Sequence, residues 1–169
     1  NFYPVRGKKL NMKDRFLVES ETFELFNTDS TSHGWERFGE NHSDKKTKAY
    51  IEGTWMTKHN GKYYMQYAAP GTEFNVYGDG VYTADNPMGP YVRYAGNPIL
   101  HRHQGYVGTG HHTLLPTRRG LYMVYHAHYN GDKIHPRQTL ISPIKFVSER
   151  NDGKRAYRLE VDDKVIIPK

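Results

Sequence analysis

The strongest constraint in this 169-residue sequence is the Asn60-Gly61 pair, which separates two strand-forming segments. Asn-Gly accepts the positive φ angles that the two-residue turn of a β-hairpin needs. The flanking residues 55–57 and 63–67 are rich in aromatic and other strand-favouring side chains. Residues 50–71 are therefore predicted to form two antiparallel strands joined by a tight turn.

One carboxylate in this segment stands out. Glu52 lies between Ile51 and Gly53, shortly before Trp55. An aromatic wall favours the neutral form of a carboxyl group, and a neighbouring glycine lets a ligand approach closely, so Glu52 is a candidate proton donor. The alternative is an ordinary glutamate at the end of a strand, facing water.

Composition extends the strand prediction to the whole chain. The sequence has 14 Tyr, 16 Gly and 9 Pro, which favours strands and turns over helices, and its length suits one domain. The absence of Cys excludes disulfides, thiolate metal sites and cysteine nucleophiles. Since no apolar run approaches transmembrane length, we expect no membrane partner. The first residue is Asn1 and no signal peptide is visible, so we expect a processed or truncated chain.

The net charge of +6 would allow binding to nucleic acid. The lysines and arginines are scattered, however, with no run longer than a pair such as Lys45-Lys46. Solvation of an ordinary surface explains this pattern better. We therefore expect no nucleic-acid partner.

Residues 27–49 are polar and predict a long loop, and such loops in compact domains are often functional. Trp35 and Phe38 are large aromatic residues within it. Aromatic rings can form the floor of a sugar site because the C–H faces of sugars pack on them. The alternative is that the two rings fasten the loop to the core.

The second half of the chain offers further strands and a group of histidines. Residues 81–84, 91–94 and 121–129 read as strands, whereas Gly78-Asp79-Gly80 reads as a turn, with a ligand or catalytic role for Asp79 as the alternative. His111, His112, His126 and His128 gather in a short stretch. A zinc site is conceivable, but the spacing fits no standard histidine-based zinc signature.

Several motifs resemble those of glycoside hydrolase family 43, whose members are five-bladed β-propellers that cleave arabinose- and xylose-containing glycans. The segment 51–55 followed by a hairpin is similar to the one that carries the general acid, although Thr54 replaces the common proline. The segments 85–91, 108–112 and 124–146 match, in order, an outer turn, a Gly-x-Gly-His element and a Tyr-His-Ala element followed by an arginine and a proline.

The resemblance implies an all-β fold of antiparallel four-stranded meanders, with two to three blades of a five-bladed propeller in this chain. It implies inverting cleavage of an oligo- or polysaccharide with Glu52 as general acid, and a secreted or periplasmic location. It further implies that His111 lies near a central ion, often assigned as calcium. The expected substrate-binding residues are Trp35, Phe38, Trp55, His112 and Arg137.

The resemblance also implies a catalytic base on a first blade, upstream of Trp35, where the only aspartates are Asp14 and Asp29. Neither has the expected short-strand context, so we expect the base outside this chain. The chain is then the C-terminal portion of a catalytic domain, with the N-terminal portion as its partner. We divide this single partial domain into residues 1–49 (weak strands and a loop), 50–100 (the blade with Glu52) and 101–169 (the last blade and a hairpin). The alternative function is a non-catalytic carbohydrate-binding β domain.

Overall fold

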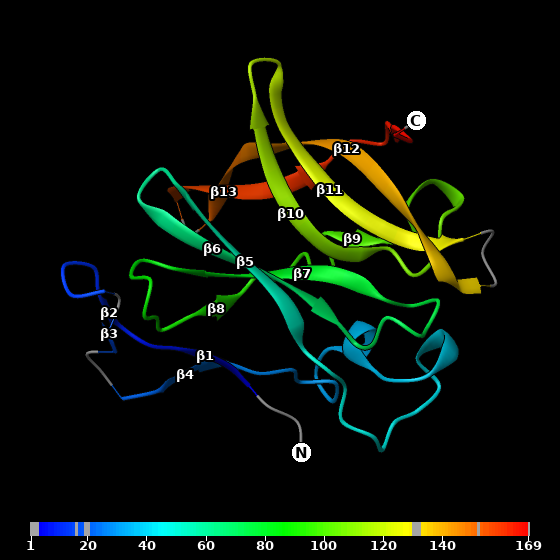
Figure 1. Cartoon of the computed structure of the whole chain (residues 1–169), viewed down its shortest axis with the longest axis horizontal. Coiled ribbons are helices and arrows are strands. Elements are labelled where there is room, and N and C mark those ends of the chain that lie inside the picture. The colour runs from blue at the N-terminus through cyan, green and yellow to red at the C-terminus, as the bar shows by residue number, and fades with distance from the viewer. Residues whose placement is uncertain (1–3, 16, 19–20, 130–132, 152, 169) are drawn as a thin grey trace.

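The computed structural model describes residues 4–15, 17–18, 21–129, 133–151 and 153–168. Its antiparallel sheets form three layers, with the β5–β8 sheet in the middle (Figure 1). The described residues contain no α-helix and three single-turn 3₁₀ helices, η1 (Gly34–Glu36), η2 (Glu40–His42) and η3 (His103–Gly105). The strands are β1 (Val5–Gly7), β2 (Leu10–Asn11), β3 (Leu17–Val18), β4 (Phe23–Phe26), β5 (Glu52–His59), β6 (Lys62–Ala69), β7 (Gly78–Ala84), β8 (Val92–Arg93), β9 (Leu100–His101), β10 (Gly110–Thr117), β11 (Gly120–Tyr129), β12 (Lys133–Asn151) and β13 (Lys154–Val161).

The predicted hairpin is confirmed and begins the middle sheet. Strands β5 and β6 pair antiparallel, and the turn residues Asn60 and Gly61 have φ values of 47° and 85°. The chain continues as a meander in the order β5-β6-β7-β8, with β9 pairing on β7. The all-β prediction is therefore confirmed for this half of the chain.

The turn predicted at Gly78-Asp79-Gly80 is wrong, because these residues form the first part of β7. Both glycines serve close packing instead of chain reversal. A Cβ atom on Gly78 would lie 2.6 Å from the Leu100 carbonyl oxygen, and one on Gly80 would lie 2.7 Å from the Trp35 ring. Asp79 is consequently a fully buried strand residue.

The second sheet repeats the arrangement in the order β10-β11-β12-β13. Its first strand, β10, lies against β5, the first strand of the middle sheet. Two consecutive four-stranded meanders that meet along their first strands are blades of a β-propeller. The chain folds as such blades, as predicted.

Strand β6 is buried on both faces because it lies between two layers. Alternate side chains of a strand point to opposite faces. Tyr64 packs in a cluster with residues of β10–β13, whereas Met65 and Tyr67 pack with Phe26 of β4 on the other face. The middle sheet thus joins the β10–β13 blade to the N-terminal layer.

The N-terminal layer consists of the pairs β1–β4 and β2–β3. Weak strands were predicted within residues 1–49, and the structure has β1 to β4 there, while residues 1–3, 16 and 19–20 lie outside the described residues. Residues 27–49 form the expected loop, with η1 and η2 inside it. Among the residues that the structure describes, no helix has the length and apolarity needed to cross a membrane.

A set of hydrogen bonds attaches the β6–β7 connection to the β10–β13 blade. The Gly108 N–H donates to the Asn75 carbonyl, at 3.1 Å, and His128 Nε2 donates to the Thr72 carbonyl, at 2.7 Å. Gly108 has φ +60°, and a Cβ atom there would lie 2.2 Å from the His128 ring. Glycine is therefore required twice at this position, by backbone conformation and by space.

Two Gly→Ala variants separate these requirements. Gly61 also has positive φ, but a Cβ atom there would meet nothing within 4 Å. We expect Gly61→Ala to lower the free energy of unfolding by about 1–2 kcal/mol, the cost of left-handed backbone. Gly108→Ala should cost ~1–3 kcal/mol more because the methyl group overlaps His128. Denaturant unfolding measures both, and equal costs would contradict the packing described for Gly108.

Candidate active site

Strands β5 and β10, each the first strand of its blade, begin with the same irregularity. Glu52 pairs with Ala68 and Trp55 with Gln66, so three steps along β5 face two along β6. In the next blade Gly110 pairs with His126 and Thr113 with Val124, which again sets three steps against two. Each is a β-bulge, and bulges re-aim side chains next to functional sites.

Each bulge contains one residue with left-handed backbone. Gly53 has φ +59° and His111 has φ +53°. A Cβ atom on Gly53 would lie 3.0 Å from the His111 ring, so glycine after Glu52 lets the two bulges touch. Gly53 was expected to let a ligand approach closely. It instead leaves space for the His111 imidazole of the neighbouring blade.

The two bulges and Tyr77 bring three polar groups together. The Tyr77 hydroxyl donates a hydrogen bond to Glu52 Oε1 at 2.7 Å, and His111 Nδ1 lies 3.5 Å from the same hydroxyl. His111 Nδ1 is 3.9 Å from Glu52 Oε1. The side chains of Glu52 and His111 are 43% and 48% exposed, whereas Tyr77 is fully buried. Glu52 is thus a partly exposed carboxyl group that is held by the hydroxyl of a buried tyrosine.

A buried network holds this arrangement in place. Asp79 Oδ1 accepts the His111 backbone N–H at 3.0 Å, and Asp79 Oδ2 lies 2.7 Å from His112 Nδ1. His112 Nε2 faces Gln66 Oε1 at 3.2 Å, and the amide of Gln66 is oriented because its nitrogen donates to the Tyr64 carbonyl. Each ring nitrogen of His112 thus faces an oxygen atom, one from Asp79 and one from Gln66, so the ring is held on both edges.

This network also holds His112, a predicted substrate-binding residue that lines the neighbouring cavity. Its side chain has no exposed surface, and its two ring nitrogens face Asp79 and Gln66, so its contact with a sugar stays a prediction. Asp79, which was predicted to lie in a turn, is instead a buried acceptor of this network. Both residues support His111 from the core.

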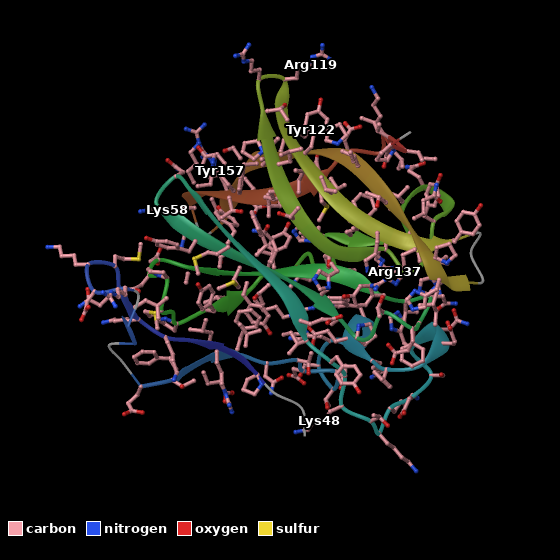
Figure 2. The ribbon with its side chains drawn as sticks, in the orientation of Figure 1. Lys48, Lys58, Arg119, Tyr122, Arg137 and Tyr157 are labelled. Carbon is pink, nitrogen blue, oxygen red and sulfur yellow. The ribbon has the colours of Figure 1, made fainter. Side chains whose placement is uncertain are left out.

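Arg137 and His126 lie beside the same group. The Arg137 guanidinium donates to His126 Nε2 at 3.3 Å, and the His126 ring stacks on Tyr77 at 5.5 Å between centroids. Burial lowers the pKa of His126 to about 4, and the Arg137 charge adds to the effect, so the ring is neutral and accepts. Figure 2 shows Arg137 at the end of the blade opposite Arg119, which marks the β10–β11 hairpin. Arg137 stays the predicted substrate-binding arginine.

A cavity of about 450 Å³ adjoins these residues. Its lining includes Trp55, His111, Val124, His126 and Thr139. Trp55 is 40% exposed, which leaves much of its indole accessible. Its assignment as a sugar platform stays a prediction, and an exposed ring beside this cavity supports it.

The other two aromatic candidates have protein partners. Trp35 packs against Tyr67, with ring centroids 5.7 Å apart. Phe38 packs edge to face on Phe74, at 4.6 Å. These contacts match the alternative in which the rings fasten the loop to the core. Their contact with a sugar stays a prediction.

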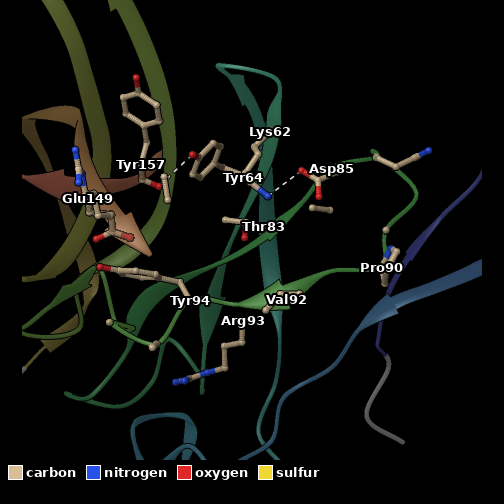
Figure 3. Close-up of a pocket in the computed structure, with 17 residues that line it drawn as sticks. Lys62, Tyr64, Thr83, Asp85, Pro90, Val92, Arg93, Tyr94, Glu149 and Tyr157 are labelled. Carbon is tan, nitrogen blue, oxygen red and sulfur yellow. Dashed lines mark hydrogen bonds and ion pairs between the residues drawn. The ribbon is translucent and has the colours of Figure 1, made fainter. Parts of the chain in front are cut away.

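A larger cavity of about 800 Å³ lies at the opposite end of the middle sheet, between the two blades (Figure 3). Lys62 and Asp85 in its wall pair with each other at 2.8 Å, and the Tyr64 hydroxyl donates to the Tyr157 carbonyl. Lys62 begins β6, whereas Ala68, the partner of Glu52, lies near the end of that strand. This cavity is therefore separate from the Glu52 group.

Calcium was expected near His111. Calcium takes six to eight oxygen ligands. Within the described ranges, no group of three or more His, Asp or Glu side chains is placed to hold a metal ion, and Asp79 is already occupied by His111 and His112. The described side chains do not form a calcium cage by themselves. His111 as a ligand therefore stays a prediction that would need water to complete the coordination.

Comparison with known families identifies the chain. The model of glycosyl hydrolases family 43 matches residues 9–153. The chain belongs to this family. The resemblance carried by the Glu52 hairpin and by residues 108–146 is thus confirmed, and the family 43 match spans the β5–β8 blade and strands β10–β12 of the next blade.

Curated relatives cover a smaller part of the chain. A β-D-galactofuranosidase of Aspergillus niger is 35% identical over 86 residues, which are 50% of this chain and 25% of that protein. A xylosidase/arabinosidase of Bacteroides ovatus is 35% identical over 79 residues, which are 47% of this chain and 22% of that protein. These matches span no more than a quarter of either relative.

Solved structures share the fold of this family 43 chain. An endo-1,4-β-xylanase of Bacteroides thetaiotaomicron superposes with a TM-score of 0.60 at 34% identity, over 70% of this chain and 39% of that one. A thermostable family-43 glycoside hydrolase superposes with a TM-score of 0.71 at 26% identity, over 96% of this chain and 48% of that one. The chain spans less than half of either structure.

Sequence reasoning missed Tyr77, Gln66 and the supporting role of Asp79. Tyr77 is one of 14 tyrosines, and nothing local separates it from the others. Gln66 offered one usable signal, since a lone amide inside the apolar strand 63–69 requires a buried partner. That partner is His112, which is distant in sequence.

The loop before β5 holds a second tyrosine–glutamate pair, outside the site. Tyr67 donates to Glu36 Oε1 at 2.5 Å, and the Asp29 N–H donates to Glu36 Oε2 at 2.7 Å. Glu36 is fully buried. Burial raises the pKa of Glu36 above its ordinary value, although the two hydrogen bonds oppose the shift.

This buried carboxyl group makes stability depend on pH. Because the folded pKa of Glu36 is raised, its contribution is present below about pH 4.5 and is lost as the pH rises through the folded value. Glu36→Gln removes the charge, and its amide can still accept the Asp29 N–H with its oxygen while its nitrogen donates to the Tyr67 hydroxyl oxygen. The melting temperature of the variant relative to the parent should therefore increase from pH 4.5 to pH 8, as measured by scanning fluorimetry. Glu24→Gln, at an exposed site on β4, is the control, and a difference independent of pH would contradict the assignment.

Proposed function

We propose that this chain carries the general acid of an inverting glycoside hydrolase acting on arabinose- or xylose-containing glycans, with Glu52 as the acid. The observation that carries the proposal is the geometry of Glu52. Its carboxyl group is 43% exposed, lies on the bulge of β5, and accepts a hydrogen bond from Tyr77 at one oxygen. A general acid must reach its substrate and be held in place. Glu52 meets both requirements.

The relatives support a glycan substrate and differ in the sugar that they name. Two are called xylosidase/arabinosidase and β-xylosidase, and a third is called β-D-galactofuranosidase. Arabinofuranose and galactofuranose share a five-membered ring, and xylose is a pentose as arabinose is. We therefore propose pentose-containing glycans as substrates, with aryl galactofuranosides as the comparison in every assay.

Inversion needs a second carboxyl group, about 6.5–9.5 Å from the acid, to activate water. Neither aspartate upstream of Trp35 has the surroundings expected of this base. Asp29 accepts the Ser32 N–H, and hydrogen bonds from Ser32 lower its pKa. Asp14 is exposed in a turn. We accordingly propose that the base comes from polypeptide outside these 169 residues.

Replacing Glu52 tests the acid role in an active enzyme that contains this chain. Glu52→Gln removes the transferable proton, so kcat/KM on glycosides with poor leaving groups should fall about 10²–10⁴-fold, the usual contribution of general acid catalysis. Aryl glycosides with acidic phenols need little protonation and should lose far less. Steady-state kinetics across a series of leaving groups measures the difference.

Glu36→Gln is the matched control, because it alters the other glutamate that accepts from a tyrosine. Its kcat/KM should stay at the parent value for every leaving group. Equal losses for good and poor leaving groups in Glu52→Gln would show that Glu52 is not the general acid.

The proposed external base leads to a separate expectation. The isolated 169-residue chain should hydrolyse aryl arabinofuranosides and xylosides weakly or not at all, because loss of general base catalysis costs about 10²–10⁴-fold. Adding the N-terminal portion of the catalytic domain should restore activity. Full activity from the isolated chain would mean that the base lies within it, and Asp29→Asn would be the first variant to make.

A further inference from the structure

The ring of Tyr77 is fixed from both sides. It lies just before β7 and is fully buried. A Cβ atom on Gly110 would lie 2.8 Å from this ring, and the His126 ring stacks on it with an interplanar angle of 12°. Its hydroxyl is therefore held 2.7 Å from Glu52 Oε1, closer than the 3.5 Å that separates it from His111 Nδ1, the other acceptor beside it.

The Tyr77 hydroxyl is the donor of this hydrogen bond, because an ionised carboxylate oxygen can only accept. A phenol has one O–H to donate, and a carboxyl oxygen is its acceptor here. Glu52 Oε1 thus receives a hydrogen bond whether Glu52 is ionised or neutral.

The two oxygens of Glu52 are therefore not equivalent. A neutral carboxyl group carries one hydrogen. If that hydrogen were on Oε1, it would compete with the Tyr77 hydrogen for the short space between the two atoms. Among the described residues, none donates to Oε2, so the hydrogen of the neutral acid is free to sit there.

We infer that Tyr77 is a positioning residue that keeps the transferable proton of Glu52 on Oε2. This rests on the proposed role of Glu52 as general acid. In the transfer the Oε2–H bond breaks, the proton goes to the glycosidic oxygen, and the electron pair of the scissile C–O bond leaves with that oxygen. The water activated by the proposed base forms the new bond to the anomeric carbon and gives its proton to that base. Tyr77 keeps its own proton and stabilises the carboxylate that forms, because hydrogen bonds to charged acceptors are stronger than those to neutral ones.

The second tyrosine–glutamate pair shows what distinguishes a structural pair from this one. Tyr67 donates to Glu36 in the same manner, but the other oxygen of Glu36 accepts the Asp29 N–H and the whole residue is buried. Both oxygens of Glu36 are thus occupied. Glu52 has the same tyrosine donor and one oxygen free toward solvent, which suits proton delivery.

The test is Tyr77→Phe in the active enzyme, with Tyr67→Phe as matched control. Phe keeps the ring that stacks on His126 and removes the hydroxyl. Loss of a hydrogen bond to a charged group should lower kcat/KM about 10–100-fold for poor leaving groups. The loss should be much smaller for activated aryl glycosides, with KM little changed. Tyr67→Phe should lower the melting temperature without changing the dependence on the leaving group.

A double-mutant cycle decides whether Tyr77 acts through Glu52. In a Glu52→Gln background, Tyr77→Phe should cause no further loss on poor leaving groups. The same loss in both backgrounds, or a loss in Tyr77→Phe equal for all leaving groups, would overturn the inference while leaving Glu52 as the acid. Glu52→Gln with no leaving-group dependence would overturn both proposals, so the two failures are distinguishable.

Discussion

The contact on which the rest of the site depends is the one between Asp79 and the start of β10. One carboxylate on β7 accepts the His111 N–H and hydrogen bonds to the His112 ring, so it fixes both backbone and side chain of the neighbouring blade. A buried polar group that loses its partner costs its full desolvation penalty, so removal of either side chain is destabilising. The pair therefore ties the two blades to one arrangement. Gln66 completes it by satisfying the other nitrogen of His112.

The segments around η2 and η3 combine left-handed backbone with contacts to each other. Asn41, His42, Arg102 and Gln104 all have positive φ values, and Arg102 hydrogen bonds to both Asn41 and Asn75. The His42 ring stacks on His101, whose pKa burial lowers to about 4, so this stack contains no two facing charges. Left-handed backbone at non-glycine residues costs of order 1–3 kcal/mol each and persists only where the surroundings impose it. Here the Arg102 hydrogen bonds and the His42–His101 stack link the segment around η2 to the segment around η3.

Much of the fold could be predicted from local patterns. The Asn60-Gly61 turn and the tyrosine-rich strands specify a hairpin through short-range conformational preferences, and the order of the motifs around Glu52, His111 and Arg137 is enough to indicate the family. The prediction for Gly78-Asp79-Gly80 was wrong because glycine serves two purposes that look alike in a sequence. Glycine can allow a turn, or it can make room for residues distant in sequence, as here for Leu100 and Trp35. The enclosure of the His112 side chain by Asp79 and Gln66 could not be predicted for a related reason. Which of two adjacent histidines faces the core depends on the bulge, and the bulge depends on pairing with β11.

The paired bulges at the starts of β5 and β10 have a consequence for which side chains the two blades can carry together. The bulges share left-handed backbone at one position, but Glu52 precedes the left-handed residue Gly53, whereas His111 is itself the left-handed residue of its bulge. The space that a side chain on residue 53 would need is filled by the His111 ring, 3.0 Å from the position of such a Cβ atom. A larger residue at position 53 and an imidazole at position 111 therefore exclude each other. Variation at either position is constrained by the residue at the other, although the two lie in different blades.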